Sequence, residues 1–393
     1  MSEMIWQGNS KFRRIYRTKF YVSYQKNMAL RKYLKLILLS VLAIAILWYF
    51  GRTLDWTEVG KSLGKANIAL LALATFIICF GYLLRAFRWR TLLAPITESD
   101  WRELFATTTI GFAAVFLFGR AGEVVRPLWL PMRDPRVRPS AALVTIGVER
   151  MCDLAAIILL FTLNLLWFRA PGGREAEFAF VNQIGILLLV GTIAGFIGLA
   201  VFQRYSAPIS VWVENSLLSR KFVPVRVANL SKNLLNNFGT ALQILSKPRE
   251  FLLVALWTGL LWLSISIPTW LIILAFDVPF SFSDALFVMG WAIVGSLVPT
   301  PGGAAGAFHT ATAGALIFMT IDRETAAAVA IIMHLIYFAP ALFFGIYYVL
   351  RGDVSWARIR SLVIADDSTR SASAEADESK SVYVLENART RKS

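Results

Sequence analysis

Long apolar runs dominate this chain and predict six membrane-spanning helices. Each run approaches the roughly 20 residues that a helix needs to cross a hydrocarbon core, and none shows the strict alternation of a membrane β-barrel strand. The predicted spans cover residues 34–50, 67–84, 141–167, 184–202, 251–274 and 326–350. The pattern therefore predicts an all-α polytopic membrane protein with a transmembrane domain over residues 34–350.

Two further apolar stretches are interrupted, and we interpret both as re-entrant hairpins that enter the membrane and return to the same side. Residues 104–118 form a run too short to cross, and the glycine-containing sequence 119–127 follows it. Residues 284–320 are broken by two prolines and three glycines between positions 299 and 306. Broken backbone survives at membrane depth only where protein or a water-filled cavity satisfies its polar groups. A loop between two ordinary spans remains the alternative for the second stretch.

The break in the second stretch is expected to present the start of a helix to the membrane midplane. Gly302 and Gly303 permit unusual backbone angles and close approach, and Gly306 follows within the same break. A helix that begins near Gly303 would direct its free amide groups towards the middle of the membrane. Such a helix end attracts anions.

Basic residues lie beside the apolar runs, and the positive-inside rule explains the net charge of +15 better than nucleic-acid binding does. The basic segments 1–33 and 203–250 are therefore expected on the cytoplasmic side of the cytoplasmic (inner) membrane. The second segment has the apolar spacing of an amphipathic helix on the membrane surface. The polar tail 351–393 is expected to be disordered, so both termini are predicted to be cytoplasmic.

This topology predicts an inverted repeat. Each re-entrant hairpin is preceded and followed by one span, and the two hairpins enter from opposite faces of the membrane. In transporters built this way, paired broken segments mark the substrate site.

Four short motifs occur in an order that resembles the lysylphosphatidylglycerol synthase/flippase-like transmembrane family. They are Tyr-Leu-Leu-Arg-Ala-Phe-Arg-Trp-Arg at 82–90, Gly-Arg-Ala-Gly-Glu-Val-Val-Arg at 119–126, Glu-Arg-Met-Cys-Asp at 149–153 and Pro-Thr-Pro-Gly-Gly at 299–303. Each motif is weak alone, and the resemblance covers roughly residues 34–350. It implies a membrane domain that translocates or handles lipids, such as a membrane phospholipid or a lipid-linked glycan.

The chain departs from this family pattern in two respects. Neither an aminoacyl-transferase domain after the last span nor a glycosyltransferase domain before the first is visible, so we expect transport rather than lysyl-lipid synthesis. Many relatives place a glutamate shortly after the Pro-Gly-Gly sequence, whereas this chain has His309 there. Whether His309 replaces that glutamate stays open. It is interpreted either as a polar donor or titrating group in a cavity or as a packing histidine.

Charged residues inside the domain are candidates for substrate binding because charge near the membrane centre is costly unless it is paired or used. Arg120 and Arg126 are expected to clamp a lipid phosphate, and Glu123 is expected to orient an arginine. Because Glu123 and Arg126 are three residues apart, a purely structural ion pair is the alternative.

A second group of charges lies near the inner end of the third span. Glu149 and Asp153 share one helical face, where they repel each other unless a cation such as Arg120, Arg126 or Arg150 lies between them. This arrangement also has a structural interpretation. Arg85 is expected to be either an interfacial anchor, like the other arginines at positions 88 and 90, or a group that faces the cavity.

The sequence predicts no cofactor and no metal site, since its two histidines and its two cysteines, Cys79 and Cys152, lack ligand spacing. The preferred hypothesis is a flippase-like lipid transporter. One alternative is a membrane-embedded lipid-modifying enzyme that uses Glu123, Glu149 or His309 as acid or base. The other is a non-catalytic membrane partner of a separately encoded glycosyltransferase or lipid-synthesising enzyme.

Overall fold

The described part of the protein is helical throughout its regular elements. The structure is a computed structural model, and it describes residues 54–137, 139–165 and 248–351, most of 41–52, and isolated positions from 167 to 205. The predicted leader 1–33, most of the fourth span, the amphipathic helix between 206 and 247 and the tail after 351 lie outside the described residues.

The first half of the described chain contains a short helix followed by two long helices that flank an interrupted segment. The short helix is α2 (Trp56–Lys65), and the long helices are α3 (Ile68–Leu93) and α6 (Pro139–Leu165). Between them lie α4 (Trp101–Phe118), the 3-10 helix η1 (Gly119–Val124) and α5 (Val125–Arg133).

The second half repeats this order of elements. The long helices are α10 (Pro248–Leu274) and α14 (Arg323–Leu350). The interrupted segment between them consists of α11 (Phe282–Ser296), the short turn α12 (Pro301–Ala304) and α13 (Ala307–Phe318).

Within the described residues, α3, α10 and α14 are long and apolar enough to cross a membrane. Helix α3 ends later than the sequence predicted: it continues beyond residue 84 to Leu93, so Arg85, Arg88 and Arg90 belong to the helix itself. Helix α4 also starts earlier than residue 104, because the Asp100 carboxylate accepts a hydrogen bond from the Arg102 amide and caps the helix at Trp101.

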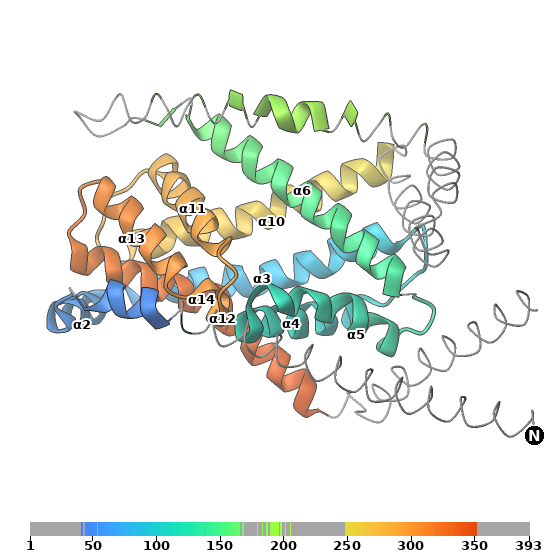
Figure 1. Cartoon of the computed structure of the whole chain (residues 1–393), viewed down its shortest axis with the longest axis horizontal. Coiled ribbons are helices and arrows are strands. Elements are labelled where there is room, and N and C mark those ends of the chain that lie inside the picture. Colours follow the sequence, from blue (N-terminus) through green and yellow to red (C-terminus); the bar gives the residue numbers. More distant parts are fainter. Residues whose placement is uncertain are drawn as a thin grey trace, which may run out of the picture.

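Helix α3 lies beside α10 (Figure 1), and small residues lie where the helices contact each other. Helix α3 contacts α10, and a Cβ atom on Gly81 would lie 2.7 Å from the Ser264 hydroxyl oxygen. Helix α14 contacts α4, and a Cβ atom on Gly345 would lie 2.6 Å from the Cβ atom of Ala113. Small residues at helix crossings permit such approach in membrane proteins.

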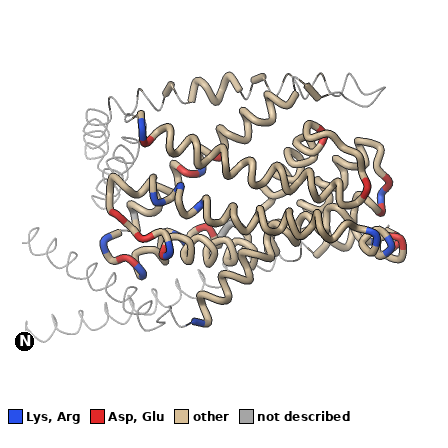
Figure 2. Tube along the Cα trace, turned by 180° about the vertical axis from the view of Figure 1, so that it is seen from behind, with Lys and Arg blue, Asp and Glu red and all other residues tan. Residues whose placement is uncertain are grey.

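The charged residues gather towards the two ends of the helical body, and an uncharged middle separates them (Figure 2). At one end, the loops before α4 and after α5 are tied together: the Ser99 hydroxyl donates to Asp134 Oδ2 (2.9 Å), and Arg136 Nη2 donates to the Glu98 carbonyl (2.8 Å). Hydrogen bonds from Arg136 hold the pKa of Asp134 below its usual value. The first interrupted segment therefore begins and ends at the same end of the molecule.

Candidate functional site

The first interrupted segment turns at Gly119. This residue has φ 63° and ψ −152°, a conformation that residues with a Cβ atom rarely adopt, and it ends α4. The chain then folds back so closely that a Cβ atom on Gly122 would lie 2.3 Å from the carbonyl carbon of Ala114. Glycine at both positions therefore allows the short return of η1 onto α4.

The second interrupted segment turns through a run of left-handed residues. Gly302, Gly303 and Ala304 have φ values of 76°, 63° and 62°. The prediction that a helix starts near Gly303 is wrong, because α13 starts at Ala307, after Gly306 at φ 86°. Left-handed backbone cannot continue into a right-handed helix, so the helix start moves beyond the last positive φ value.

The turns of the two interrupted segments contact each other in the middle of the helical body (Figure 1). Turn α12 contacts both α4 and η1. A Cβ atom on Gly119 would lie 2.9 Å from the carbonyl oxygen of Thr300, and one on Gly303 would lie 3.1 Å from the rings of Phe116 and Phe338. Residues that are far apart in sequence therefore form one shared junction.

Both histidines of the chain lie beside this junction and are buried. The Gly306 amide donates to Nδ1 of His309 (3.3 Å), so this imidazole accepts the hydrogen bond of a backbone amide at the start of α13. His334 Nε2 donates to the carbonyl of Gly303 (3.1 Å), and the two imidazole centroids are 4.7 Å apart. This hydrogen-bonded packing occupies the position where the sequence suggested a free anion-binding helix end.

A buried ion-pair network joins α5 to α6. The two terminal nitrogens of Arg126 donate to the two carboxylate oxygens of Glu149 at 2.9 and 3.0 Å, and the Glu149 side chain is 0% exposed. The Arg126 guanidinium also lies 4.3 Å from the centre of the Trp89 ring. Bidentate geometry of this kind is the strongest form of an arginine–carboxylate pair.

Arg88 extends the network to α3. Its terminal nitrogens donate to the two oxygens of Asp153 at 2.5 and 3.2 Å, and one of them lies 3.3 Å from Glu149. Arg150 lies 3.2 Å from Glu149 and 3.6 Å from Asp153. Three guanidinium groups and two carboxylates leave a formal charge of +1 among these five side chains.

Sequence reasoning missed Arg88, which it treated as an interfacial anchor. The side chain is 0% exposed and carries the pair with Asp153, whereas Arg90 on the same helix is exposed. The one available signal was spacing: Arg88 follows Arg85 by three residues on α3, so the two side chains lie on neighbouring parts of the helix surface.

The first segment's predicted pair between Glu123 and Arg126 is not present. Glu123 is half-buried in η1, and the carboxylate partner of Arg126 is Glu149, because α6 brings that residue against α5. The side chain of Arg120 lies outside the described residues, although its backbone belongs to η1.

Arg85 lies in a different environment from the paired arginines. Its guanidinium is 4.5 Å from the centre of the Phe112 ring, and no carboxylate of the described residues forms an ion pair with it. It lines a pocket of about 150 Å³ between α3, α4, α10 and α14. Polar groups of Tyr82, Ser264 and Tyr337 line the same pocket. The pocket therefore combines a half-buried positive charge with hydroxyl groups.

Comparisons with known proteins cover most of this helical region. The model of the family described as "Lysylphosphatidylglycerol synthase TM region" matches residues 35–345. A UPF0104 membrane protein of Pyrococcus horikoshii is 22% identical over 337 residues, which are 81% of this chain and 96% of that protein. The glycosyltransferase AglD of Haloferax volcanii is 32% identical over 160 residues, which are 38% of this chain but 24% of that protein.

Proposed function

The chain belongs to the lysylphosphatidylglycerol synthase transmembrane family, and from this premise we propose that it binds the anionic or phosphate-bearing head group of a membrane lipid and moves it between leaflets. The observation that carries the proposal is Arg85, a half-buried guanidinium without a carboxylate partner among the described residues, in a pocket between helices of membrane-spanning length. A charged residue within a helix of membrane-spanning length is a candidate for a substrate path.

The proposal includes an inverted repeat, in which α3, α4, α5 and α6 correspond to α10, α11, α13 and α14. The helix contacts support it because they occur in matching pairs. Helix α3 contacts α4 and α14, and α10 contacts α11 and α6; α5 contacts α6, and α13 contacts α14. The two interrupted segments would then be the re-entrant hairpins, with six full spans around them and both termini in the cytoplasm.

Cysteine labelling tests this topology. In a variant without Cys79 and Cys152, single cysteines at the exposed positions Lys61 and Pro135 should face opposite sides of the cytoplasmic membrane. A membrane-impermeant maleimide added to intact cells should label position 61, and position 135 only after the cells are opened. If the first interrupted segment crossed the membrane completely, both positions would be labelled from the same side.

In the proposed mechanism the lipid phosphate enters the pocket while the acyl chains stay in the membrane. Arg85 provides charge-assisted hydrogen bonds to the phosphate. The hydroxyls of Ser264 and Tyr337 donate to the carbonyls of Leu261 and Ile265, so Arg85 is the donor on which the proposal depends. The network of Arg88, Arg126 and Glu149 joins α3, α5 and α6 into one unit. A movement of that unit against α10 and α14 at the glycine junction would expose the head group to the other leaflet.

This mechanism assigns Arg126 a different role from the phosphate clamp expected from the sequence. Both terminal nitrogens of Arg126 already donate to Glu149, so a phosphate would have to break a bidentate pair to reach them. In this mechanism Arg126 and Glu149 therefore hold α5 against α6, and Arg85 binds the lipid phosphate. The part of Arg120 in phosphate binding stays a prediction.

Replacing Arg85 by glutamine should slow head-group transfer about 10–100-fold, because hydrogen bonds to charged groups contribute about 1.5–3 kcal/mol. The measurement is dithionite quenching of fluorescent phosphatidylglycerol in vesicles that contain the purified protein. Arg90→Gln is the matched control, since it removes an exposed charge from the same helix. Equal transfer rates for the two variants would refute the assignment of Arg85.

A second candidate function is a membrane partner for a glycosyltransferase. The observation that favours it is the similarity to a part of AglD, a protein named as a glycosyltransferase. Lipid mass spectrometry of cells with and without the protein separates the two functions. Loss of a glycosylated lipid would favour the partner role, whereas an unchanged pool with an altered leaflet distribution would favour transport.

A further inference from the structure

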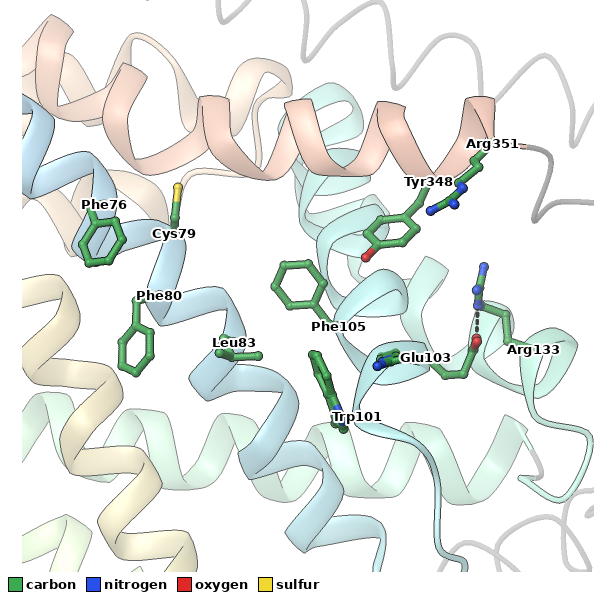
Figure 3. A pocket seen from close by; sticks show the side chains of 11 residues that line it. Phe76, Cys79, Phe80, Leu83, Trp101, Glu103, Phe105, Arg133, Tyr348 and Arg351 are labelled. Atoms are coloured by element: carbon green, nitrogen blue, oxygen red, sulfur yellow. Dashed lines mark hydrogen bonds and ion pairs between the residues drawn. The ribbon is translucent and has the colours of Figure 1, made fainter.

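A second, larger pocket opens on the opposite face of α3 from Arg85. Its volume is about 510 Å³, and it lies between α3, α4 and the end of α14 (Figure 3). Residues 76, 79, 80 and 83 of α3 line it, whereas residues 78, 81, 82 and 85 line the Arg85 pocket. At 3.6 residues per turn these two sets face opposite directions. We call the larger pocket the lateral groove.

One end of the lateral groove is apolar. Phe76, Phe80 and Leu83 of α3 and Phe105 of α4 line it, and Phe76 and Phe80 are 69% and 50% exposed. Residues 76 to 83 extend over about 10 Å along the helix. Because α3 is one of the helices of membrane-spanning length, these exposed rings lie where hydrocarbon would surround them.

The other end of the lateral groove is basic. Arg102, Arg133 and Arg351 line it together with Glu103, which gives a formal charge of +2 from three arginines and one glutamate. Arg133 pairs with Glu103, whereas neither Arg102 nor Arg351 forms an ion pair with a carboxylate of the described residues. Figure 3 shows the phenylalanine rings towards one end and Glu103, Arg133 and Arg351 at the other.

Two aromatic residues support a position of the basic end at the level of lipid head groups. Trp101 and Tyr348 line the groove near Glu103 and Arg351 respectively (Figure 3), and such aromatic residues are enriched at the membrane–water interface. The Arg102 guanidinium lies 5.5 Å from the Trp101 ring centre, and Arg351 Nη1 donates to the Tyr347 hydroxyl (2.8 Å). Both arginines are exposed and retain other donors.

We propose that the lateral groove binds an anionic phospholipid, separately from the Arg85 pocket. Arg102 and Arg351 bind its phosphate, and an acyl chain lies along Phe76 and Phe80. Charge complementarity selects this occupant: an apolar groove that ends in arginines without an ion-pair partner in the part of the chain that the structure describes fits an acyl chain with a negative head group. The same charge disfavours the chain's own basic segment 1–33, which it would repel.

Cys79 provides a direct report on occupancy, because it lines the lateral groove while the other described cysteine, Cys152, does not. The full chain in detergent micelles is treated with N-ethylmaleimide, and peptide mass spectrometry follows the alkylation of both cysteines. Phosphatidylglycerol should slow alkylation of Cys79 at least about fivefold without changing that of Cys152. Phosphatidylcholine and inorganic phosphate should have little effect, which separates a lipid head group from a free anion.

The variant Arg102→Gln/Arg351→Gln should raise the phosphatidylglycerol concentration needed for half-protection about 30-fold, which corresponds to about 1 kcal/mol for each arginine. The matched control is Arg52→Gln/Arg323→Gln, because it makes the same charge change with exposed residues outside the groove. Cys152 alkylation shows that the double variant remains folded.

Several results would overturn the proposal. If phosphatidylcholine protected Cys79 as well as phosphatidylglycerol does, the basic end would not contribute to lipid binding. Unreactive Cys79 without lipid would mean that another part of the chain covers the groove. Equal half-protection concentrations for the two double variants would exclude Arg102 and Arg351 as phosphate ligands. Arg85→Gln should leave Cys79 protection unchanged, so this test is independent of the transfer assay.

Discussion

The variant Glu149→Gln is expected to lose about 3–5 kcal/mol of unfolding free energy, because removing one partner of a buried pair leaves an uncompensated charge. Glu149 lies within 3.3 Å of Arg88 and within 3.2 Å of Arg126 and Arg150, and its side chain is fully buried. A glutamine at this position would place a neutral amide beside three guanidinium groups, which would lose the negative charge that they share. Unfolding by sodium dodecyl sulfate in mixed micelles measures the change.

The control for this variant is Glu58→Gln, which removes an exposed glutamate paired with Lys61. Exposed pairs contribute about 0–1 kcal/mol, so this change should be nearly neutral. The double variant Glu149→Gln/Arg126→Gln should recover at least about 1 kcal/mol relative to the sum of the single variants, since directly bonded residues are coupled. Additive losses would mean that the Arg126–Glu149 contact contributes no coupling energy.

The variant Gly119→Ala is expected to lose about 2–4 kcal/mol and to slow lipid transfer as well. The φ and ψ values of Gly119 belong to a region that is essentially restricted to glycine, and occupying it with alanine costs about 1–3 kcal/mol. The added methyl group would also lie 2.9 Å from the Thr300 carbonyl oxygen and press against the second interrupted segment. Unfolding in mixed micelles and the dithionite assay measure the two effects.

The matched control is Gly314→Ala within α13. A Cβ atom there would meet nothing within 4 Å, and alanine favours the helix by about 0.5–1 kcal/mol over glycine. This variant should therefore be neutral or slightly stabilising. If both alanine variants had the same stability and transfer rate, the contact between Gly119 and Thr300 would have no role in either property.

Several features of the fold follow from local sequence. The apolar runs predict the long helices, and the all-helical prediction is confirmed for the elements that the structure describes. The glycines at positions 119, 302, 303 and 306 predict the two breaks, and all four have positive φ values. These features depend on neighbouring residues alone, so composition and spacing are sufficient to predict them.

The charged site depends on contacts between distant residues. The sequence indicated that Glu149 and Asp153 need a cation, but it interpreted Arg88 and Arg90 only as interfacial anchors and gave Arg85 alone a second interpretation, as a group that faces the cavity. In the structure Arg88 is buried in an ion pair, Arg85 lines a pocket and Arg90 is exposed.

The sequence by itself determined that this protein is a helical membrane protein with two broken segments, because hydrophobic periodicity and glycine placement act within a few residues. The tertiary structure alone decided which charges pair and where the broken segments meet. The distance from Arg88 to Asp153, or from Gly119 to Thr300, depends on how α3, α6, α4 and α12 pack. Since the stability of a buried charge depends on its partner, packing separates the paired arginines from Arg85, which lines a pocket and has no ion-pair partner among the described residues.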